Sequence, residues 1–123
     1  MRREKTVKIT FEELQAYLHH TYGGRGQETG MFMKLVEEIG EVAEVLNMRS
    51  GRKAENSDDL QEELANELVD VIHYTVAIAA INGIDLNTTL IEKDRKAAMK
   101  YHHDINLESF IRDRRMNGKE AQP

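Results

Sequence analysis

The sequence contains no cysteine and no tryptophan, and it has one proline among 123 residues. The absence of cysteine excludes disulfide bonds, thiolate zinc sites and cysteine nucleophiles. The scarcity of proline favours helices, because proline is the residue that most strongly interrupts them. Long alternating runs of β-branched residues, which would favour strands, are also missing. A chain of this length suits one domain.

Positive charge is in deficit as well. Lysine and arginine number 17 against 22 acidic residues, which gives a net charge of -5. This balance argues against a nucleic-acid partner, because phosphate backbones bind basic surfaces. We find no apolar run long enough to cross a bilayer, and the start, "MRREKTVK", lacks the apolar core of a signal peptide. We therefore expect a cytoplasmic protein with no membrane partner.

Helix-starting signals divide what remains into an all-α chain. Thr10 and Glu13 have the spacing of a capping box, and Asp58 with Gln61 repeats it. Asp85 can cap a later helix, and the glycine-rich "YGGRGQETG" and "NG" at 82 and 83 are breaks. The predicted helices after the first are about 31–48, 58–81, 86–103 and a short one at 105–115. We expect a single domain over 1–123, with a core at about 10–103 and a flexible tail at about 116–123.

The stretch "KLVEEIGEVAEVLN" at 34–47 places glutamates in a helix that otherwise resembles a core helix. At about 100° per residue, Glu37, Glu38, Glu41 and Glu44 lie within roughly a third of its circumference. The opposite side carries Leu35, Ile39, Val42, Ala43 and Leu46. A solvated acidic face is one interpretation of this pattern.

The next helix favours another interpretation. Its Glu63, Glu67 and Asp70 lie within an arc of roughly 60°. Residues 68–81 are mostly apolar on all sides, so we expect this helix to be buried. A carboxylate there costs several kcal/mol, on the order of a buried charge, unless its charge is compensated. The helix has no basic residue besides His73.

Two acidic stripes on successive antiparallel helices can face each other. Glu38 with Glu41 and Glu67 with Asp70 share the i, i+3 spacing that sets side chains next to one another. Facing pairs would give four carboxylates converging on one or two hard divalent cations, which prefer oxygen ligands. We therefore predict a metal site between these helices.

The combination of "EEIGE" with a later "ELVD" resembles the EExxE…ExxD signature of the MazG-like all-α nucleotide pyrophosphohydrolases. The resemblance extends over about 10–103, through the fourth helix. It implies a bundle of four main helices plus a short C-terminal helix, assembled as a homodimer or homotetramer. It also implies Mg²⁺-dependent cleavage of a nucleoside triphosphate between the α and β phosphates, with Mn²⁺ as a possible substitute.

The resemblance also assigns roles to residues. Glu38, Glu41, Glu67 and Asp70 are the implied metal ligands, and Glu37 is the other acid that could act on the attacking water. The implied catalytic residues are thus Glu37 and Glu38, and the implied substrate-binding residues are Lys34, Lys93 and Lys100. One departure from the family pattern concerns substrate choice: Ala97 stands where relatives often have asparagine, and Lys100 where they often have arginine.

Two other classes of protein remain as alternatives. "DVIH" at 70–73 is similar to half of a di-iron site, which needs an acid-x-x-His motif on two helices. No second such motif occurs on a core-like helix, and we expect His73 to be a hydrogen-bonded core or interface residue. A non-catalytic helical oligomer whose acidic stripes face water is the second alternative.

Overall fold

The computed structural model describes residues 6–24, 26–51 and 57–121, and these contain helices and no strand. The helices are α1 Phe11–Tyr22, α2 Glu28–Gly51, α3 Ser57–Ile81, α4 Leu86–Lys100 and α5 Leu107–Ala121. The all-α class is therefore confirmed. The contacts divide the chain into two compact units, Met1–Ile84 and Asp85–Pro123. The first unit holds α1 to α3 and the second holds α4 and α5.

Local capping explains several of the helix ends. The Glu13 amide donates to Thr10 Oγ1 at 3.1 Å while the Thr10 amide donates to the Glu13 carboxylate at 2.8 Å, which confirms the predicted capping box. Asp85 caps α4 by accepting from the Thr88 amide at 3.1 Å, also as predicted. Gly83, at φ +66°, closes α3 in a Schellman motif, because the Ile84 amide reaches the Ala79 carbonyl at 2.9 Å.

Other boundaries differ from the prediction. The second helix starts at Glu28 rather than Met31, and Asp58 lies inside α3 instead of preceding it. The fourth helix ends at Lys100 because the His103 amide turns back to the Ala98 carbonyl at 2.8 Å. His102 takes the left-handed position of this second Schellman motif, at φ +58°. The fifth helix continues past its predicted end at Arg115 to Ala121.

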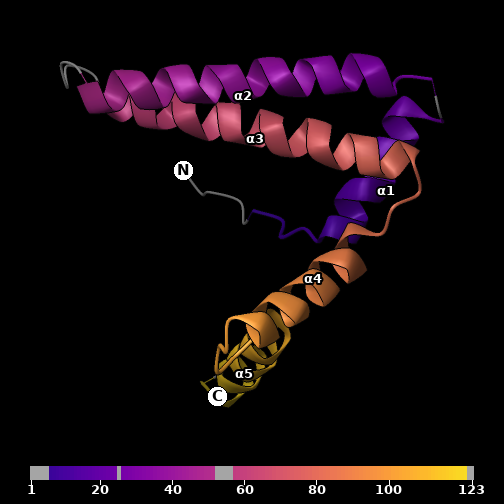
Figure 1. Ribbon diagram of the computed structural model, residues 1–123, viewed down its shortest axis with the longest axis vertical. Helices are drawn as coiled ribbons and strands as arrows, with labels where there is room; N and C mark the ends of the chain where they lie inside the picture. The colour runs from indigo at the N-terminus through magenta and orange to yellow at the C-terminus, as the bar shows by residue number, and fades with distance from the viewer. Residues whose placement is uncertain (1–5, 25, 52–56, 122–123) are drawn as a thin grey trace. The chain divides into compact units, whose positions relative to one another are not determined.

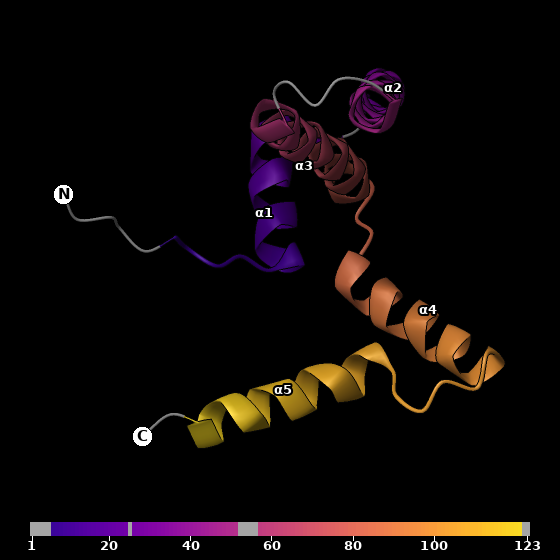
Figure 2. The same cartoon turned by 90° about the vertical axis from the view of Figure 1, so that its left-hand side faces the viewer.

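In the first unit, α2 and α3 lie side by side and run antiparallel, and α1 packs against α3 (Figures 1 and 2). The buried apolar side chains gather where α1 meets the C-terminal half of α3, with Leu18 and Val76 fully enclosed. The Gln15 amide nitrogen also donates to the Ile84 carbonyl at 2.6 Å, which ties α1 to the end of this unit. The unit therefore has its core at one end of the α2–α3 pair.

The expected burial of α2 and α3 is only partly correct. On α2, the residues turned inward are Met31, Glu38 and Val45, spaced seven apart, while Ile39 and Leu46 are about half exposed. On α3, Leu68, Val69 and Ile72 are 45–60% exposed. The reason is that each helix carries apolar residues on two sides, and one side alone finds a partner within the unit.

One helical segment, Asp59–Ile81, is long and apolar enough to cross a membrane, by length and composition only. This corrects the expectation that no run reaches that length. The segment packs against both α1 and α2, and it carries Glu67 and Asp70 on the side facing α2. Those contacts are typical of a core helix, and length alone is weak support for a membrane span.

In the second unit, α5 contacts α4 through ion pairs and helix-capping hydrogen bonds. The Leu107 amide donates to the Asp94 carboxylate at 2.6 Å, which caps the start of α5. Arg95 and Arg112 both donate to Glu108, at 2.9 and 2.7 Å. Asn106 and Ser109 exchange backbone-to-side-chain hydrogen bonds in a further cap. Ala98 is the buried apolar residue of this unit among those described.

Candidate metal centre

The candidate site lies between α2 and α3, where the antiparallel register pairs acidic residues. Glu38 of α2 meets Asp70 of α3, and Glu41 meets Glu67 one turn along. In the opposite direction along the two helices, Lys34 of α2 and Tyr74 of α3 both line one cavity. Each step of three or four residues on α2 is matched by an equal step backward on α3. This is the register that the paired i, i+3 spacing requires if both acidic pairs are to meet.

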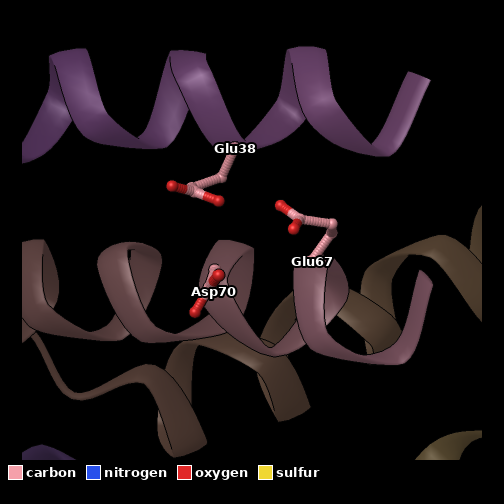
Figure 3. A group of neighbouring side chains, drawn as sticks. All are labelled: Glu38, Glu67 and Asp70. Atoms are coloured by element: carbon pink, nitrogen blue, oxygen red, sulfur yellow. The ribbon is translucent and has the colours of Figure 1, made fainter. Parts of the chain in front are cut away.

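Three of the four predicted ligands converge directly. Each of Glu38, Glu67 and Asp70 offers a carboxylate oxygen, and these oxygens lie within 4.8 Å of one another. Figure 3 shows Glu38 extending from α2 and Glu67 from α3 toward each other, with Asp70 beside them. Such a separation is close for like charges but short enough for one small cation to contact several of the oxygens.

Two of these carboxylates have an oxygen without a partner. Glu38 is 9% exposed and is the buried charged residue of the described chain. Its Oε2 and that of Glu67 are shielded from solvent and accept no hydrogen bond from any described residue. A buried carboxylate oxygen left unpaired is costly, so it indicates a group that binds there.

The pKa of Glu67 shows the same lack of a counter-charge. Hydrogen bonding to Glu41, then burial, then hydrogen bonding to Glu38 raise the pKa of this carboxyl from 4.5 to about 7. The charges of Glu41 and Glu38 raise it further in the same direction. Like charges and desolvation both favour the protonated form, and a cation among the acids would reverse that preference. Glu41 itself is exposed, and its contact with Glu67 places it at the rim of the cluster.

The donor set fits a hard divalent cation. All contributions are carboxylate oxygens, with no sulfur and no imidazole, which suits Mg²⁺ or Mn²⁺ better than softer metals. His73 lies outside the group, because its Nε2 is 2.6 Å from the Tyr22 hydroxyl oxygen. The prediction that His73 is hydrogen-bonded is thus confirmed, and the histidine that a di-iron site would need is engaged elsewhere.

The other predicted site residues are not members of this cluster. The Glu37 side chain is 59% exposed and pairs with Lys34 Nζ at 3.7 Å, so these two occupy the neighbouring face of α2. Lys93 and Lys100 are exposed on α4, in the second unit, and Lys100 Nζ lies 5.4 Å from the Tyr101 ring centre. Glu63 and Glu44 are exposed as well.

Sequence reasoning missed the aromatic neighbours of the cluster. Tyr22 and Tyr74 flank His73, with ring centres 5.7 and 4.9 Å from its ring. Tyr74 follows Asp70 by four residues, so its place on the same side of α3 as the acids is the signal that could have identified it. Tyr22, by contrast, is the last residue of α1, and Gln27 lies in the glycine-rich segment before α2, where no periodicity indicates the direction of a side chain.

Together, the helical fold and the carboxylate cluster define an all-α protein with a site suited to a divalent cation. Comparison with known proteins specifies the class further. Residues 27–103 match the MazG nucleotide pyrophosphohydrolase domain. The chain therefore belongs to the MazG nucleotide pyrophosphohydrolase family, whose members are metal-dependent hydrolases.

Individual relatives agree with this assignment. The crystal structure of iMazG from Vibrio DAT 722 is 33% identical and superimposes with a TM-score of 0.59, covering 76% of this chain and 98% of that one. The uncharacterized protein YpjD of Bacillus subtilis (strain 168) is 29% identical over 84 residues, which is 68% of this chain and 74% of YpjD. The matched region of the family ends at residue 103, so α5 lies beyond it.

Proposed function

We propose that this protein hydrolyses nucleoside triphosphates between the α and β phosphates, in a Mg²⁺-dependent reaction that gives a nucleoside monophosphate and pyrophosphate. The observation that carries the proposal is the pair of buried, unpartnered carboxylate oxygens on Glu38 and Glu67, one on each facing helix. Family membership supplies the nucleotide pyrophosphohydrolase activity. The bond cleaved and the metal are our inference.

Glu38, Glu67 and Asp70 would hold the cation, with Glu41 completing the set from the rim. When bound, Mg²⁺, or Mn²⁺ in its place, supplies positive charge to phosphate oxygens and lowers the pKa of a water molecule. The carboxylates then orient the reacting groups, which is the main task in phosphoryl chemistry. Neither a cysteine nor a serine nucleophile is needed.

The remaining roles follow from charge and position. Glu37 and Glu38 are the carboxylates we propose to orient the attacking water and accept its proton. Lys34, which pairs with Glu37 at 3.7 Å, can exchange that partner for a phosphate oxygen without a large movement. We assign Lys93 and Lys100 to the phosphates as well, because a triphosphate carries more negative charge than one cation neutralises.

We further propose that the working protein is a homodimer or homotetramer in the cytoplasm. Phe32, Val36, Ile39 and Leu46 follow one another at spacings of four, three and seven residues on α2 and are 46–55% exposed. Exposed apolar stripes of this kind favour association between helices. A monodisperse monomer at micromolar concentration by light scattering would refute the assembly.

The experiment that tests the function is a panel of ribo- and deoxyribonucleoside triphosphates assayed for pyrophosphate release with Mg²⁺, Mn²⁺ or EDTA. We expect stoichiometric monophosphate and pyrophosphate with either metal and none in EDTA. Release of orthophosphate instead would move the cleaved bond to the β–γ position. No product from any triphosphate would favour the non-catalytic helical oligomer.

A further inference from the structure

A cavity of about 420 Å³ lies within the first unit, next to the carboxylate cluster. Its walls come from the end of α1, the segment leading into α2, the first turns of α2 and the facing side of α3. The side chains that matter below are Tyr22, Gln27, Met31, Lys34 and Tyr74. The carboxylates themselves do not line it.

The helical register fixes how far this cavity is from the acids. Lys34 precedes Glu38 by four residues on α2, and Tyr74 follows Asp70 by four on α3. Four residues of helix rise about 6 Å, so the cavity lies one turn from the cluster along the α2–α3 groove. That offset is comparable to the span of the ribose that joins a nucleobase to its α-phosphate.

The chemistry of the walls is that of a site for a flat heterocycle. Two tyrosine rings and the Met31 thioether offer apolar, polarisable surface, and a carboxamide supplies a directional polar group. Bases stack on aromatic side chains of this kind regardless of sequence, because every base has a π-face. A triphosphate bound at the acids would carry its base into this space.

We propose that this cavity binds the nucleobase of the substrate and that Gln27 selects bases bearing an exocyclic amino group, an inference that rests on the proposed function. Gln27 Nε2 donates to the Tyr22 carbonyl oxygen at 2.8 Å. That bond distinguishes the nitrogen of the Gln27 side-chain amide from its oxygen, since a carbonyl oxygen can accept a hydrogen bond only from the nitrogen. Gln27 Oε1 is then an acceptor with no donor among the described residues.

An amide oxygen aimed at a base edge discriminates between amino and carbonyl groups. The amino groups of cytosine and adenine donate to it, whereas uracil and hypoxanthine present a carbonyl oxygen at the same position. Placing two acceptors together leaves both unpaired, whereas an amino group would pair with the amide oxygen, so the two bases differ by one hydrogen bond. The site therefore favours cytosine over uracil and adenine over hypoxanthine.

His73 holds the two tyrosines in place. Its Nε2 and the Tyr22 hydroxyl oxygen are 2.6 Å apart, and its ring meets Tyr74 edge to face at 4.9 Å between centres. Burial raises the pKa of Tyr22 above its usual 10, so its hydroxyl stays protonated and keeps a proton to share with the His73 ring nitrogen. The stacking surfaces are thus ordered before a base arrives, which reduces the entropy lost on binding.

A larger groove of about 600 Å³ is a weaker candidate for the base. Its walls, which include Gly40, Ala43 and Asn47, all belong to α2, so it is the open surface of one helix. It has no aromatic side chain to stack on a base. A base there would also find nothing from α3, which carries half of the metal ligands.

The kinetic test uses pairs of substrates that differ in one group: CTP against UTP, and ATP against ITP, with ribose 5-triphosphate as the base-free probe. In the wild-type protein we expect the amino-bearing member of each pair to have the higher kcat/KM. Tyr74→Leu should raise KM for the nucleotides by about tenfold, on the scale of one lost stacking contact, and leave KM for ribose 5-triphosphate unchanged. Gln27→Leu should abolish the preference within each pair.

The control is Tyr17→Leu, because Tyr17 lies on α1, is 63% exposed and does not line the cavity. It should behave as wild type with every substrate. Equal effects of Tyr74→Leu on nucleotides and on ribose 5-triphosphate would overturn the base pocket. So would a wild-type preference for UTP and ITP, which would contradict the role of Gln27.

A second measurement separates this inference from the proposed function. In an NMR titration of the ¹⁵N-labelled full chain without metal, cytidine should shift the Gly26 and Gly30 amides and the Gln27 side-chain amide, and uridine should shift them less. If the protein releases no pyrophosphate yet shows these shifts, the proposed reaction fails and the pocket stands. If turnover occurs but cytidine leaves these signals unmoved, the pocket fails and the reaction stands.

Discussion

Glu67 and Glu108 are the same residue type on helices of the same chain, yet their surroundings are opposite. Glu108 accepts hydrogen bonds from Arg95 and Arg112, and Arg95 chiefly lowers the pKa of its carboxyl. Glu67 faces Glu41 and Glu38, which raise its pKa to about 7. The α4–α5 unit thus supplies its own counter-charges, whereas the carboxylates of Glu38, Glu67 and Asp70 have no basic partner among the described residues. This difference separates a structural ion network from a binding site.

The largest effect should come from neutralising acids in the cluster. We predict that Glu41→Gln and Asp70→Asn each reduce pyrophosphate release by roughly a hundredfold or more, the scale of a lost transition-state electrostatic contact. Glu108→Gln, a matched change in the ion network, should stay within about twofold of wild type. The measurement is turnover in Mg²⁺. Near-wild-type turnover in both cluster variants would put their acids in the same structural class as Glu108.

A tenfold effect is expected for the phosphate contact that we propose for Lys93. We predict that Lys93→Ala raises KM or lowers kcat by about tenfold, equivalent to about 1.4 kcal/mol, because a phosphate contact is lost. Lys96→Ala is the control, since Lys96 is an exposed lysine on the same helix. If both variants match wild type, the second unit contributes structure only.

The dependence of stability on pH should have opposite signs in the two regions. The folded-state pKa of Glu67 lies above its unfolded value of 4.5, so its contribution is full below pH 4.5 and is lost as pH rises through about 7. The pKa of Glu108 is lowered, so its contribution is present above 4.5 and is lost as pH falls through the folded value.

Melting curves in EDTA from pH 4 to 8 measure this contrast. Relative to Glu67→Gln, wild type should lose Tm as pH rises from about 5 to 8, and Mg²⁺ should remove the loss. A difference between the two proteins that does not change with pH would contradict the assignment of the raised pKa to Glu67.

The smallest effect should come from the ion network itself. Glu108→Gln should lower Tm slightly, and the loss should be smaller at high salt. The reason is that the Arg95 and Arg112 side chains are 49% and 75% exposed, so salt screens their charges. Glu92→Gln on the same unit is the control, since Glu92 takes part in no ion pair among the described residues. A large loss of stability that salt does not reduce would show that the network is more than a surface feature.

Much of the fold followed from local signals in the sequence. The capping box at Thr10, the cap at Asp85 and the glycine at 83 act over a few residues, so their outcome does not depend on tertiary packing. At the other end, the helix that was predicted to end at Arg115 continues and contains Gly118. A glycine weakens a helix by about 1 kcal/mol but does not stop it, and α5 runs through it to Ala121.

The candidate site was predictable to a similar extent. The i, i+3 pairs identified Glu38, Glu67 and Asp70 because helical spacing alone brings such residues onto one side. The direction in which α2 faces α3 was not predictable, since α2 has apolar residues on two sides and periodicity does not choose between them. For the same reason the sequence pointed to Ile39 as a core residue, whereas Glu38 is the one enclosed.

The central claim is that the acids between α2 and α3 form a cation site and not an ion-pair network. The most direct test is a thermal melt of wild type and Asp70→Asn, each in EDTA and in Mg²⁺, on the same preparations. We predict that Mg²⁺ raises Tm of wild type and not that of the variant, and that in EDTA the variant melts level with wild type or above it, because repulsion is relieved. A variant that melts below wild type in EDTA, with no Mg²⁺ effect on either protein, would contradict the claim.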